Sequence, residues 1–345
     1  MIHHRKHINK KLNHCALLMS GFIASSAFSA DTPPDALPPP TAADVSYGTH
    51  ERQKLDFYQA KSDKPTPVLF VIHGGGWMYG DKYTEVAGDR VKAQTKAYLD
   101  AGVSVVSINY RYIFWDARIG VVKPPVKWPL EDAARALQFV RSKAKEWNLD
   151  KDRICGFGGS AGGCSALWLA FHGDMADPKS DDPVARESTR LWCAAVIGAQ
   201  TSLDPKQMKE WTPNSKYGGH AFGFMGSGSK PGGDDQNTRD SFFADFLAHR
   251  EEVLPWIKEY SPYELLTKDD PPVYLIYDSV PALGQDVKDP THTANFGVKL
   301  QEHCKELCVE CELVYPGAPD VKHQKIEQYI IETLKAPSAK SIKTK

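Results

Sequence analysis

The feature that most constrains the fold is a series of short apolar segments that alternate with longer segments of helical periodicity. The apolar segments have the length of buried strands and lie at 67–72, 103–108, 153–157, 193–197, 273–277 and 311–315. The segments of helical periodicity lie at 130–147, 162–171, 296–307 and 326–334. Strands that alternate with helices form a mostly parallel sheet covered on both faces. The sequence therefore predicts an α/β fold with its site beyond the carboxyl ends of the strands.

A glycine-rich turn between two of these elements has the pattern of a nucleophilic serine. Gly158-Gly159-Ser160-Ala161-Gly162 matches G-x-S-x-G, follows a predicted strand and precedes a predicted helix. In this motif the serine lies on a tight strand-to-helix turn that only small neighbours allow, and its hydroxyl is exposed above the sheet edge. The amino end of the following helix favours developing negative charge. We therefore predict Ser160 as a nucleophile.

A second glycine motif, His73-Gly74-Gly75-Gly76-Trp77, directly follows the strand at 67–72. Consecutive glycines let backbone N–H groups turn toward a substrate oxygen. Each such donor stabilises a tetrahedral oxyanion by about 3 kcal/mol. The sequence therefore predicts an oxyanion-binding loop after this strand.

These two motifs, together with Asn109-Tyr110-Arg111, resemble those of the hormone-sensitive-lipase-like and acetyl-esterase (HGGG) carboxylesterase branch of the α/β-hydrolases, over roughly residues 68–334. The resemblance implies the α/β-hydrolase fold, with a mostly parallel central sheet, helices on both faces and a cap-like insertion. It also implies a Ser–His–Asp triad. The remaining implied roles are an oxyanion hole formed by the N–H groups of Gly75, Gly76 and Ala161, scaffold positions at Tyr110, Arg111 and Asp132, and a loop-ordering role for His73.

The acid of the triad should follow the strand at 273–277, because the order along the chain in this fold is serine, acid, histidine. Three aspartates follow that strand: Asp278, Asp286 and Asp289. Counted back from the strand at 312–314, the family spacing indicates Asp289, with Asp286 as the next candidate. Asp278 ranks third, because the family tends to have glycine at the strand end.

The base should follow the last strand, where residues 315–318 resemble the stretch before the family's histidine. At the expected histidine position this chain has Pro319-Asp320, and the next histidine is His323. We predict His323 as the base, brought over Ser160 by a shifted loop. His292, in the loop that carries the acid, is the alternative. A third possibility is a broken triad, since a serine hydroxyl is a weak nucleophile unless a base takes its proton.

A long segment, about residues 201–260, separates two core strands and is rich in aromatic residues. Loops of this length inside a compact domain are usually functional or mobile. We expect the segment to roof the pocket and help to select the acyl or alcohol group, with a helix over 242–254. Residues 113–115 and Trp128 form a second aromatic group. An aromatic wall suits a sugar or phenolic ring, although aromatic residues at helical spacing more often belong to the core.

The N-terminus is predicted to be an export signal, residues 1–30. It is basic up to Asn13, then apolar, then rich in small residues, which is the order of a secretory signal peptide. A Pro-rich linker (31–43), one α/β-hydrolase domain (44–336) and a basic tail (337–345) would follow. We expect a secreted or periplasmic protein that has no membrane contact after signal removal. An uncleaved anchor is the alternative.

Composition and cysteine content limit the partners. The formal net charge of −1 provides no basic face for nucleic acid. Six cysteines remain after the signal, and an even count in an exported chain permits disulfides, with a local bridge among Cys304, Cys308 and Cys311. No second cluster lies at zinc-ligand spacing. We expect no metal or organic cofactor, and the oligomeric state stays open.

The predicted function is therefore a secreted serine carboxylesterase that needs no cofactor. Its substrate would be a small-molecule or carbohydrate ester, such as one carrying acetyl or feruloyl groups. A serine peptidase of the same fold would normally carry an additional domain. The alternative from another class is a non-catalytic pseudo-hydrolase that binds carbohydrate or protein, which the displaced histidine suggests.

Overall fold

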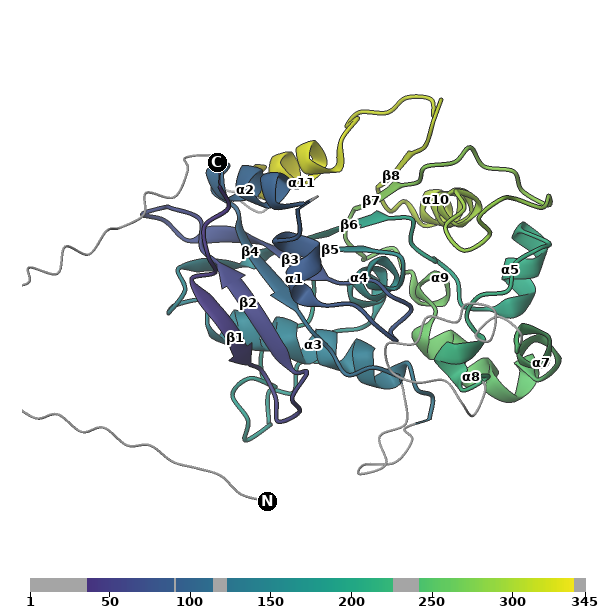
Figure 1. Ribbon diagram of the computed structural model, residues 1–345, viewed down its shortest axis with the longest axis horizontal. Coiled ribbons are helices and arrows are strands. Elements are labelled where there is room, and N and C mark those ends of the chain that lie inside the picture. The colour runs from purple at the N-terminus through teal and green to yellow at the C-terminus, as the bar shows by residue number, and fades with distance from the viewer. Residues whose placement is uncertain (1–35, 90, 114–122, 226–241, 338–345) are drawn as a thin grey trace, which may run out of the picture. The chain divides into compact units, whose positions relative to one another are not determined.

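Eight strands form one sheet in the order β1-β2-β4-β3-β5-β6-β7-β8 (Figure 1). The computed structural model describes residues 36–337 except 90, 114–122 and 226–241, so the predicted signal, most of the basic tail, Phe114 and Trp115 lie outside the described residues. The strands are β1 (Ala42–Ser46), β2 (Lys54–Tyr58), β3 (Thr66–Ile72), β4 (Ser104–Ile108), β5 (Leu149–Gly159), β6 (Cys193–Ile197), β7 (Val273–Ile276) and β8 (Cys311–Val314). Strand β2 is antiparallel to β1 and β4, and all the other pairs are parallel. The six predicted strands are therefore present in a mostly parallel sheet, as expected.

Strands β1 and β2 were not predicted from the sequence. The middle of β2 carries Asp56, which is only 5% exposed and forms an ion pair with Lys82 at 2.8 Å. This buried carboxylate interrupts an otherwise apolar segment and hides its strand character. Strand β1 begins at Ala42, so its first two residues belong to the segment 31–43 that we predicted to be a linker.

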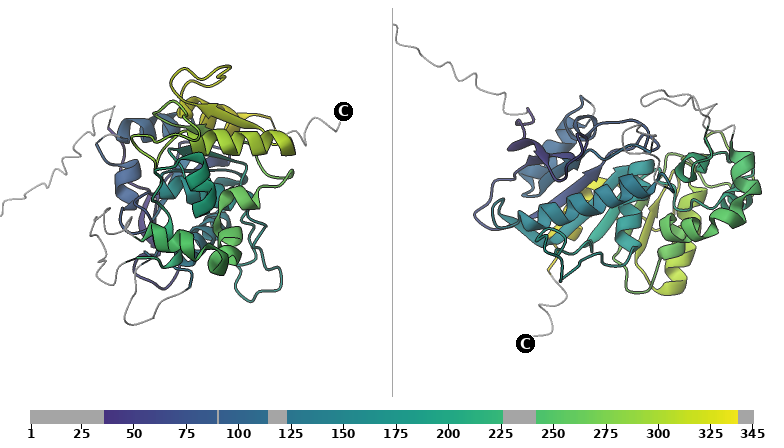
Figure 2. Two further views of the ribbon diagram at one scale, coloured as in Figure 1. Left: turned by 90° about the vertical axis from the view of Figure 1, so that its right-hand side faces the viewer. Right: turned by 90° about the horizontal axis from the view of Figure 1, so that it is seen from below.

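Helices cover both faces of the sheet (Figure 2). One face packs against α1 (Lys82–Val86), α2 (Lys92–Asp100) and α11 (Ile326–Lys335). The other face packs against α3 (Lys127–Ser142), α4 (Ala161–Phe171) and α10 (Asn295–Leu307). Strand β3 shows the two-residue alternation that this layering requires, since Leu69 and Val71 belong to the first core and Val68, Phe70 and Ile72 to the second. The described helices include none long and apolar enough to cross a membrane.

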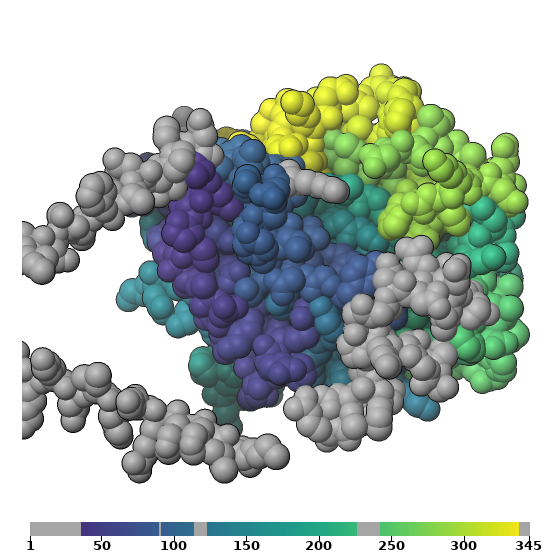
Figure 3. Space-filling model, viewed as in Figure 1, coloured from purple at the N-terminus to yellow at the C-terminus, as the bar shows by residue number. Residues whose placement is uncertain are grey.

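Helices α2 and α11 lie side by side, although they come from opposite ends of the chain. In the space-filling view, blue residues of the α1–α2 region adjoin the yellow C-terminal residues (Figure 3). The Gln94 side-chain amide donates to Glu327 at 2.6 Å, and Lys335 donates to the Ala101 carbonyl at 3.0 Å. These contacts join α2 to α11 on that face of the sheet.

The predicted cap-like insertion between β6 and β7 is largely helical where it is described. It contains α5 (Pro205–Trp211), the 3₁₀ helix η1 (Gly219–Phe222), α7 (Phe243–Ala248), α8 (Arg250–Tyr260) and then α9 (Pro262–Leu265). Asp204 caps α5 by accepting from the Lys206 amide at 2.8 Å. The same carboxylate accepts two hydrogen bonds from the Arg250 guanidinium, at 2.8 and 2.6 Å, which ties α5 to α8. The helix predicted over 242–254 is divided between α7 and α8 at His249.

All six cysteines after the predicted signal are free, so the local bridge that we considered does not form. The neighbouring Cys304 on α10 and burial both raise the pKa of the Cys311 thiol on β8. Cys308 is exposed and has the left-handed conformation that ends α10.

Candidate active site

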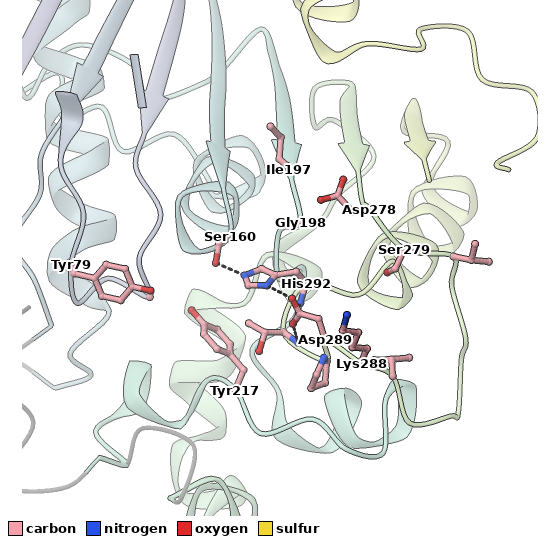
Figure 4. A pocket seen from close by; sticks show the side chains of 15 residues that line it. Tyr79, Ser160, Ile197, Gly198, Tyr217, Asp278, Ser279, Lys288, Asp289 and His292 are labelled. Atoms are coloured by element: carbon pink, nitrogen blue, oxygen red, sulfur yellow. Dashed lines mark hydrogen bonds and ion pairs between the residues drawn. The ribbon is translucent and has the colours of Figure 1, made fainter. Parts of the chain in front are cut away.

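Ser160 lies at the turn between β5 and α4, in the backbone geometry that the motif predicts. Its φ is 53° and its ψ is −125°, a conformation that is strained for a residue with a side chain. The Ser160 amide donates to the Ile197 carbonyl at 2.9 Å, and the Cys164 amide donates to the Ser160 carbonyl at 2.9 Å. Both bonds hold the turn, so the hydroxyl stands at the carboxyl edge of the sheet beside the first turn of α4 (Figure 4).

The glycines of the motif permit a close approach between β3, β5 and α4. A Cβ added at Gly162 would overlap the carbonyl oxygen of Ile72. A Cβ added at Gly158 would lie 2.5 Å from the carbonyl carbon of Gly162. Only glycine at these two positions lets the helix start directly over the strand end.

Replacing Gly162 by alanine is expected to destabilise the fold by about 1–3 kcal/mol, because the added methyl group forces α4 away from β3. The matched control is Gly173→Ala, since a Cβ at Gly173 meets no atom within 4 Å. Thermal unfolding of the two variants measures the difference. Equal midpoints for both would show that the helix does not depend on this contact.

His292 lies against Ser160 and connects it to Asp289. The Nε2 atom of His292 is 2.9 Å from the Ser160 Oγ, and its Nδ1 atom is 2.8 Å from the Asp289 Oδ2. The three side chains form one hydrogen-bonded line across the pocket (Figure 4). An ionised carboxylate can only accept, so the Nδ1–H donates to Asp289, and the Nε2 lone pair of the neutral ring is left to accept from the Ser160 hydroxyl. This arrangement can remove the serine proton.

The carboxylate of Asp289 is held in its ionised form. Burial raises its pKa. The hydrogen bond and charge interaction with His292 and two backbone N–H donors together lower the pKa by more than burial raises it, so the pKa lies below its usual value. Those backbone donors are the amides of Thr291, at 3.0 Å, and of His292, at 3.2 Å, both on Oδ1. The turn from Asp289 to His292 thus fixes acid and imidazole within four residues.

Two asparagines brace the loop 278–294 that carries this turn. The Asn214 side chain donates to the Val287 carbonyl at 2.7 Å and accepts from the Val287 amide at 3.2 Å. The Asn295 side chain, fully buried, accepts from the Ala282 amide at 2.7 Å and donates to the Trp211 carbonyl at 2.9 Å. The loop is therefore attached both to the insertion and to α10, although it has no regular secondary structure.

The glycine loop after β3 lies directly beside the serine. A Cβ added at Gly74 would lie 3.6 Å from the Ser160 Cβ. Gly75 and Gly76 have φ values of 97° and 59°, which turn their peptide groups as the sequence predicts. Among the described residues, none accepts a hydrogen bond from the N–H of Gly75 or Gly76. Ala161 is the first residue of α4, and the first N–H groups of a helix have no partner within it.

His73 orders the glycine loop from within the protein. Its ring is fully buried, stacks on Tyr110 at 4.1 Å and lies 2.8 Å from the Gly74 carbonyl through Nδ1. The Arg52 guanidinium lies 3.4 Å from Nε2. A carbonyl accepts and a guanidinium donates, so the neutral ring carries its proton on Nδ1. Burial lowers the pKa of His73 to about 4, and the ring stays neutral.

The free energy of unfolding is expected to fall by about 3 kcal/mol as the pH drops from about 6.5 to about 4, because His73 takes up a proton when the protein unfolds. In that interval the unfolded chain binds a proton at this residue and the folded chain does not, so lower pH favours unfolding. Urea unfolding at several pH values measures the effect. In His73→Asn, which has a lower stability but no titrating ring, this part of the pH dependence should disappear. An identical slope in both proteins would contradict the assignment.

Two hollows meet at Ser160. The larger, about 910 Å³, is lined by residues from the glycine loop, the insertion and the 278–294 loop, among them Gly76, Tyr217, Asp278 and Lys288. The second, about 620 Å³, is lined by Gly74, Gly75, Thr84, Glu85 and Asp278, among others. Ser160, His292 and Asp289 border both. A substrate at the serine can therefore extend to either side of the reacting bond.

The structure corrects our prediction that His323 is the base. His323 is 3% exposed and lies between β8 and α11, where Nδ1 is 2.6 Å from Glu312 and Nε2 is 3.2 Å from Glu332. Both ring nitrogens have carboxylate partners, and the Tyr274 hydroxyl donates to the His323 carbonyl at 2.9 Å. The His323 ring is thus engaged by the two glutamates, and His292, not His323, is the histidine in hydrogen-bond contact with Ser160.

The structure brings together Ser160, Asp289 and the alternative histidine, His292. Asp278 stands at the end of β7 and lines both hollows, but bonds to neither the ring nor the serine. Asp286 is exposed in the loop and lines neither hollow. The described residues contain no group of three or more His, Cys, Asp or Glu side chains arranged to hold a metal ion.

The sheet order, the serine turn and the glycine loop define a protein of the α/β-hydrolase fold with a serine-centred site. The BD-FAE family model matches residues 55–280, which is more than half of the chain. The chain therefore belongs to the BD-FAE family.

Curated relatives match shorter parts of the chain. Versiconal hemiacetal acetate esterase of Dothistroma septosporum is 34% identical over 131 residues, which cover 37% of this chain and 35% of that protein. Gut esterase 1 of Caenorhabditis elegans is 32% identical over 167 residues, 48% of this chain and 28% of that protein. The match thus spans about a third of the length of these relatives or less.

A solved structure supports the fold. The truncated form of a carbohydrate esterase from gut microbiota superposes with a TM-score of 0.57 at 19% identity, covering 88% of this chain and 99% of that one.

Proposed function

We propose that this protein is a carboxylic ester hydrolase that works through an acyl-enzyme on Ser160. The observation that carries the proposal is the line of hydrogen bonds from Ser160 through His292 to Asp289. The esterase activity named for both curated relatives supports the same class of reaction. Because the match covers only part of those relatives, the activity of this chain is inferred from its own site.

The residues of the site have distinct roles in the proposed reaction. The Ser160 oxygen attacks the ester carbonyl carbon while the Nε2 of His292 takes its proton. The N–H groups of Gly75, Gly76 and Ala161 stabilise the negative charge that develops on the carbonyl oxygen. The imidazolium then gives the proton to the departing alcohol, and the acyl group remains on Ser160. Water, deprotonated by the same ring, releases the acid and restores the serine.

Acetyl esters on carbohydrate or other small molecules are the proposed substrates. Both hollows open beside Ser160, and Tyr79 and Tyr217 supply aromatic surface to the larger one. We also propose export, on the order of basic, apolar and small residues within 1–30.

The test is covalent labelling together with ester hydrolysis. A fluorophosphonate probe should modify the wild-type protein at one site, identified as Ser160 by mass spectrometry, and p-nitrophenyl acetate should be hydrolysed. Ser160→Ala should lose both reactions. Labelling at another residue, or hydrolysis that survives in Ser160→Ala, would refute the proposal. If the wild-type protein is folded but shows neither reaction, the proposal is refuted and a ligand-binding protein is the remaining alternative.

A further inference from the structure

Asp278 is a carboxylate on the shared wall of the two hollows. It lies two residues after the end of β7, lines both hollows together with Ser160 and His292, and is exposed. In the described part of the chain, no side chain or amide donates a hydrogen bond to Asp278 or forms an ion pair with it. By contrast, Asp289 on the same loop has three donors. The acceptor atoms of Asp278 are therefore available to a bound molecule.

The backbone beneath Asp278 is firmly held. The Tyr277 amide donates to the Val314 carbonyl at 2.9 Å, and the Tyr277 hydroxyl donates to the Ala199 carbonyl at 2.8 Å. The Gly198 amide donates to the Ile276 carbonyl at 2.8 Å. Figure 4 shows Asp278 near the end of β7, close to Ile197 and Gly198. A side chain on a rigid strand end can act as a fixed contact for a substrate.

The charges around Asp278 restrict which groups can bind beside it. Among the described residues, the smaller hollow is lined by the acidic residues Glu85, Asp278 and Asp289 and by no lysine or arginine. The larger hollow is lined by Lys288 as well as by Asp278 and Asp289. Ionised carboxylates accept hydrogen bonds but donate none. Their best neutral partners are hydroxyl groups, and an anionic group in the smaller hollow would be repelled.

We infer that Asp278 is a specificity-determining residue that accepts hydrogen bonds from hydroxyl groups of a polyhydroxy ester and disfavours anionic esters. The inference rests on the proposed function, since it concerns the substrate of the same serine. It assigns Asp278 no part in the bond-making steps. Hydrolysis of a small neutral aryl ester should therefore not need it.

The experiment compares three esters on the full chain: p-nitrophenyl acetate, glycerol monoacetate and p-nitrophenyl hemisuccinate. The variants are Asp278→Ala, which removes the acceptor, and Asp278→Asn, which removes the charge and keeps the shape. The matched control is Asp286→Asn, an exposed aspartate of the same loop that lines neither hollow.

For Asp278→Ala we expect kcat/KM for glycerol monoacetate to fall about tenfold and that for p-nitrophenyl acetate to change less than about twofold. For Asp278→Asn we expect kcat/KM for the hemisuccinate to rise about fivefold at low salt, and this gain should shrink at high ionic strength. Asp286→Asn should match the wild type on all three esters.

Equal losses on the aryl and glycerol esters would show a merely structural role and overturn the inference. Unchanged ratios among the three esters in both Asp278 variants would overturn it as well. A wild-type protein inactive on all three esters would instead refute the proposed function, and the inference with it. The aryl acetate rate thus separates failure of the proposed function from failure of the specificity assignment.

Discussion

Replacing His292 by alanine is expected to lower kcat for p-nitrophenyl acetate by about 10⁴-fold or more. The imidazole is the acceptor in contact with the Ser160 hydroxyl, at 2.9 Å. Without it the hydroxyl must lose its proton to water, and the alcohol must leave without a proton donor. The measurement is steady-state hydrolysis, with the rate of fluorophosphonate labelling as a second readout. Labelling should slow in parallel, because it depends on the same activated oxygen.

His323→Ala is the matched comparison for this prediction. His323 contacts Glu312 and Glu332, not the serine, so its loss should leave kcat within about twofold. It should lower the unfolding midpoint, because truncation leaves the Glu312 carboxylate without its imidazole partner, at a cost of about 1–3 kcal/mol. The reverse pattern, an inactive but fully stable His323→Ala beside an active His292→Ala, would return the role of base to His323.

The failure of the His323 prediction has a physical origin. The order serine, acid, histidine is obeyed along this chain, but the histidine comes from the same loop as the acid. Counting toward a histidine after β8 assumed that one loop supplies the acid and the next supplies the base. Spacing alone cannot show where a loop without regular structure places its side chains, because the groups that brace it, Asn214 and the Trp211 carbonyl bound by Asn295, belong to a distant segment.

The parts of the fold that the sequence predicted are those with strong local signals. Strand β3 is a run of mostly apolar residues that is soon followed by glycines. Ser160 lies in a run of small residues between a strand and a helix, which is the local pattern of the motif. Strand β2 gives a weak signal because it buries Asp56, and the partner that makes this possible, Lys82, is on another element. A long-range ion pair of this kind has no local sequence pattern.

The placement of acid and base on one turn has a consequence for how the site is maintained. Asp289 and His292 are held by bonds within four residues, and both are substantially exposed, with side-chain exposures of 61% and 40%. Solvent weakens each individual interaction at such positions. The orientation of the ring therefore depends on the geometry of the turn, in which the Asp289 Oδ1 is occupied by two backbone donors.

Asp289→Asn is expected to lower kcat about 10⁴-fold although it changes only one atom. The amides of Thr291 and His292 both donate to Oδ1, so the asparagine must keep its oxygen there and turn its NH₂ group toward the ring. That NH₂ group donates, and the Nδ1 of His292 must then accept. The ring's proton moves to Nε2, where it faces the Ser160 hydroxyl, and the ring can no longer take the serine proton.

The control for this variant is Asp286→Asn, which changes the charge of the same loop by the same amount without touching the ring. A loss caused by charge alone would affect both variants, whereas a loss caused by the tautomer affects only Asp289→Asn. Unfolding midpoints should stay close to the wild type in both, since these side chains are on the surface. Near-normal kcat for Asp289→Asn would mean that the ring keeps its Nδ1 proton without the carboxylate, and the turn itself would then be sufficient to orient the base.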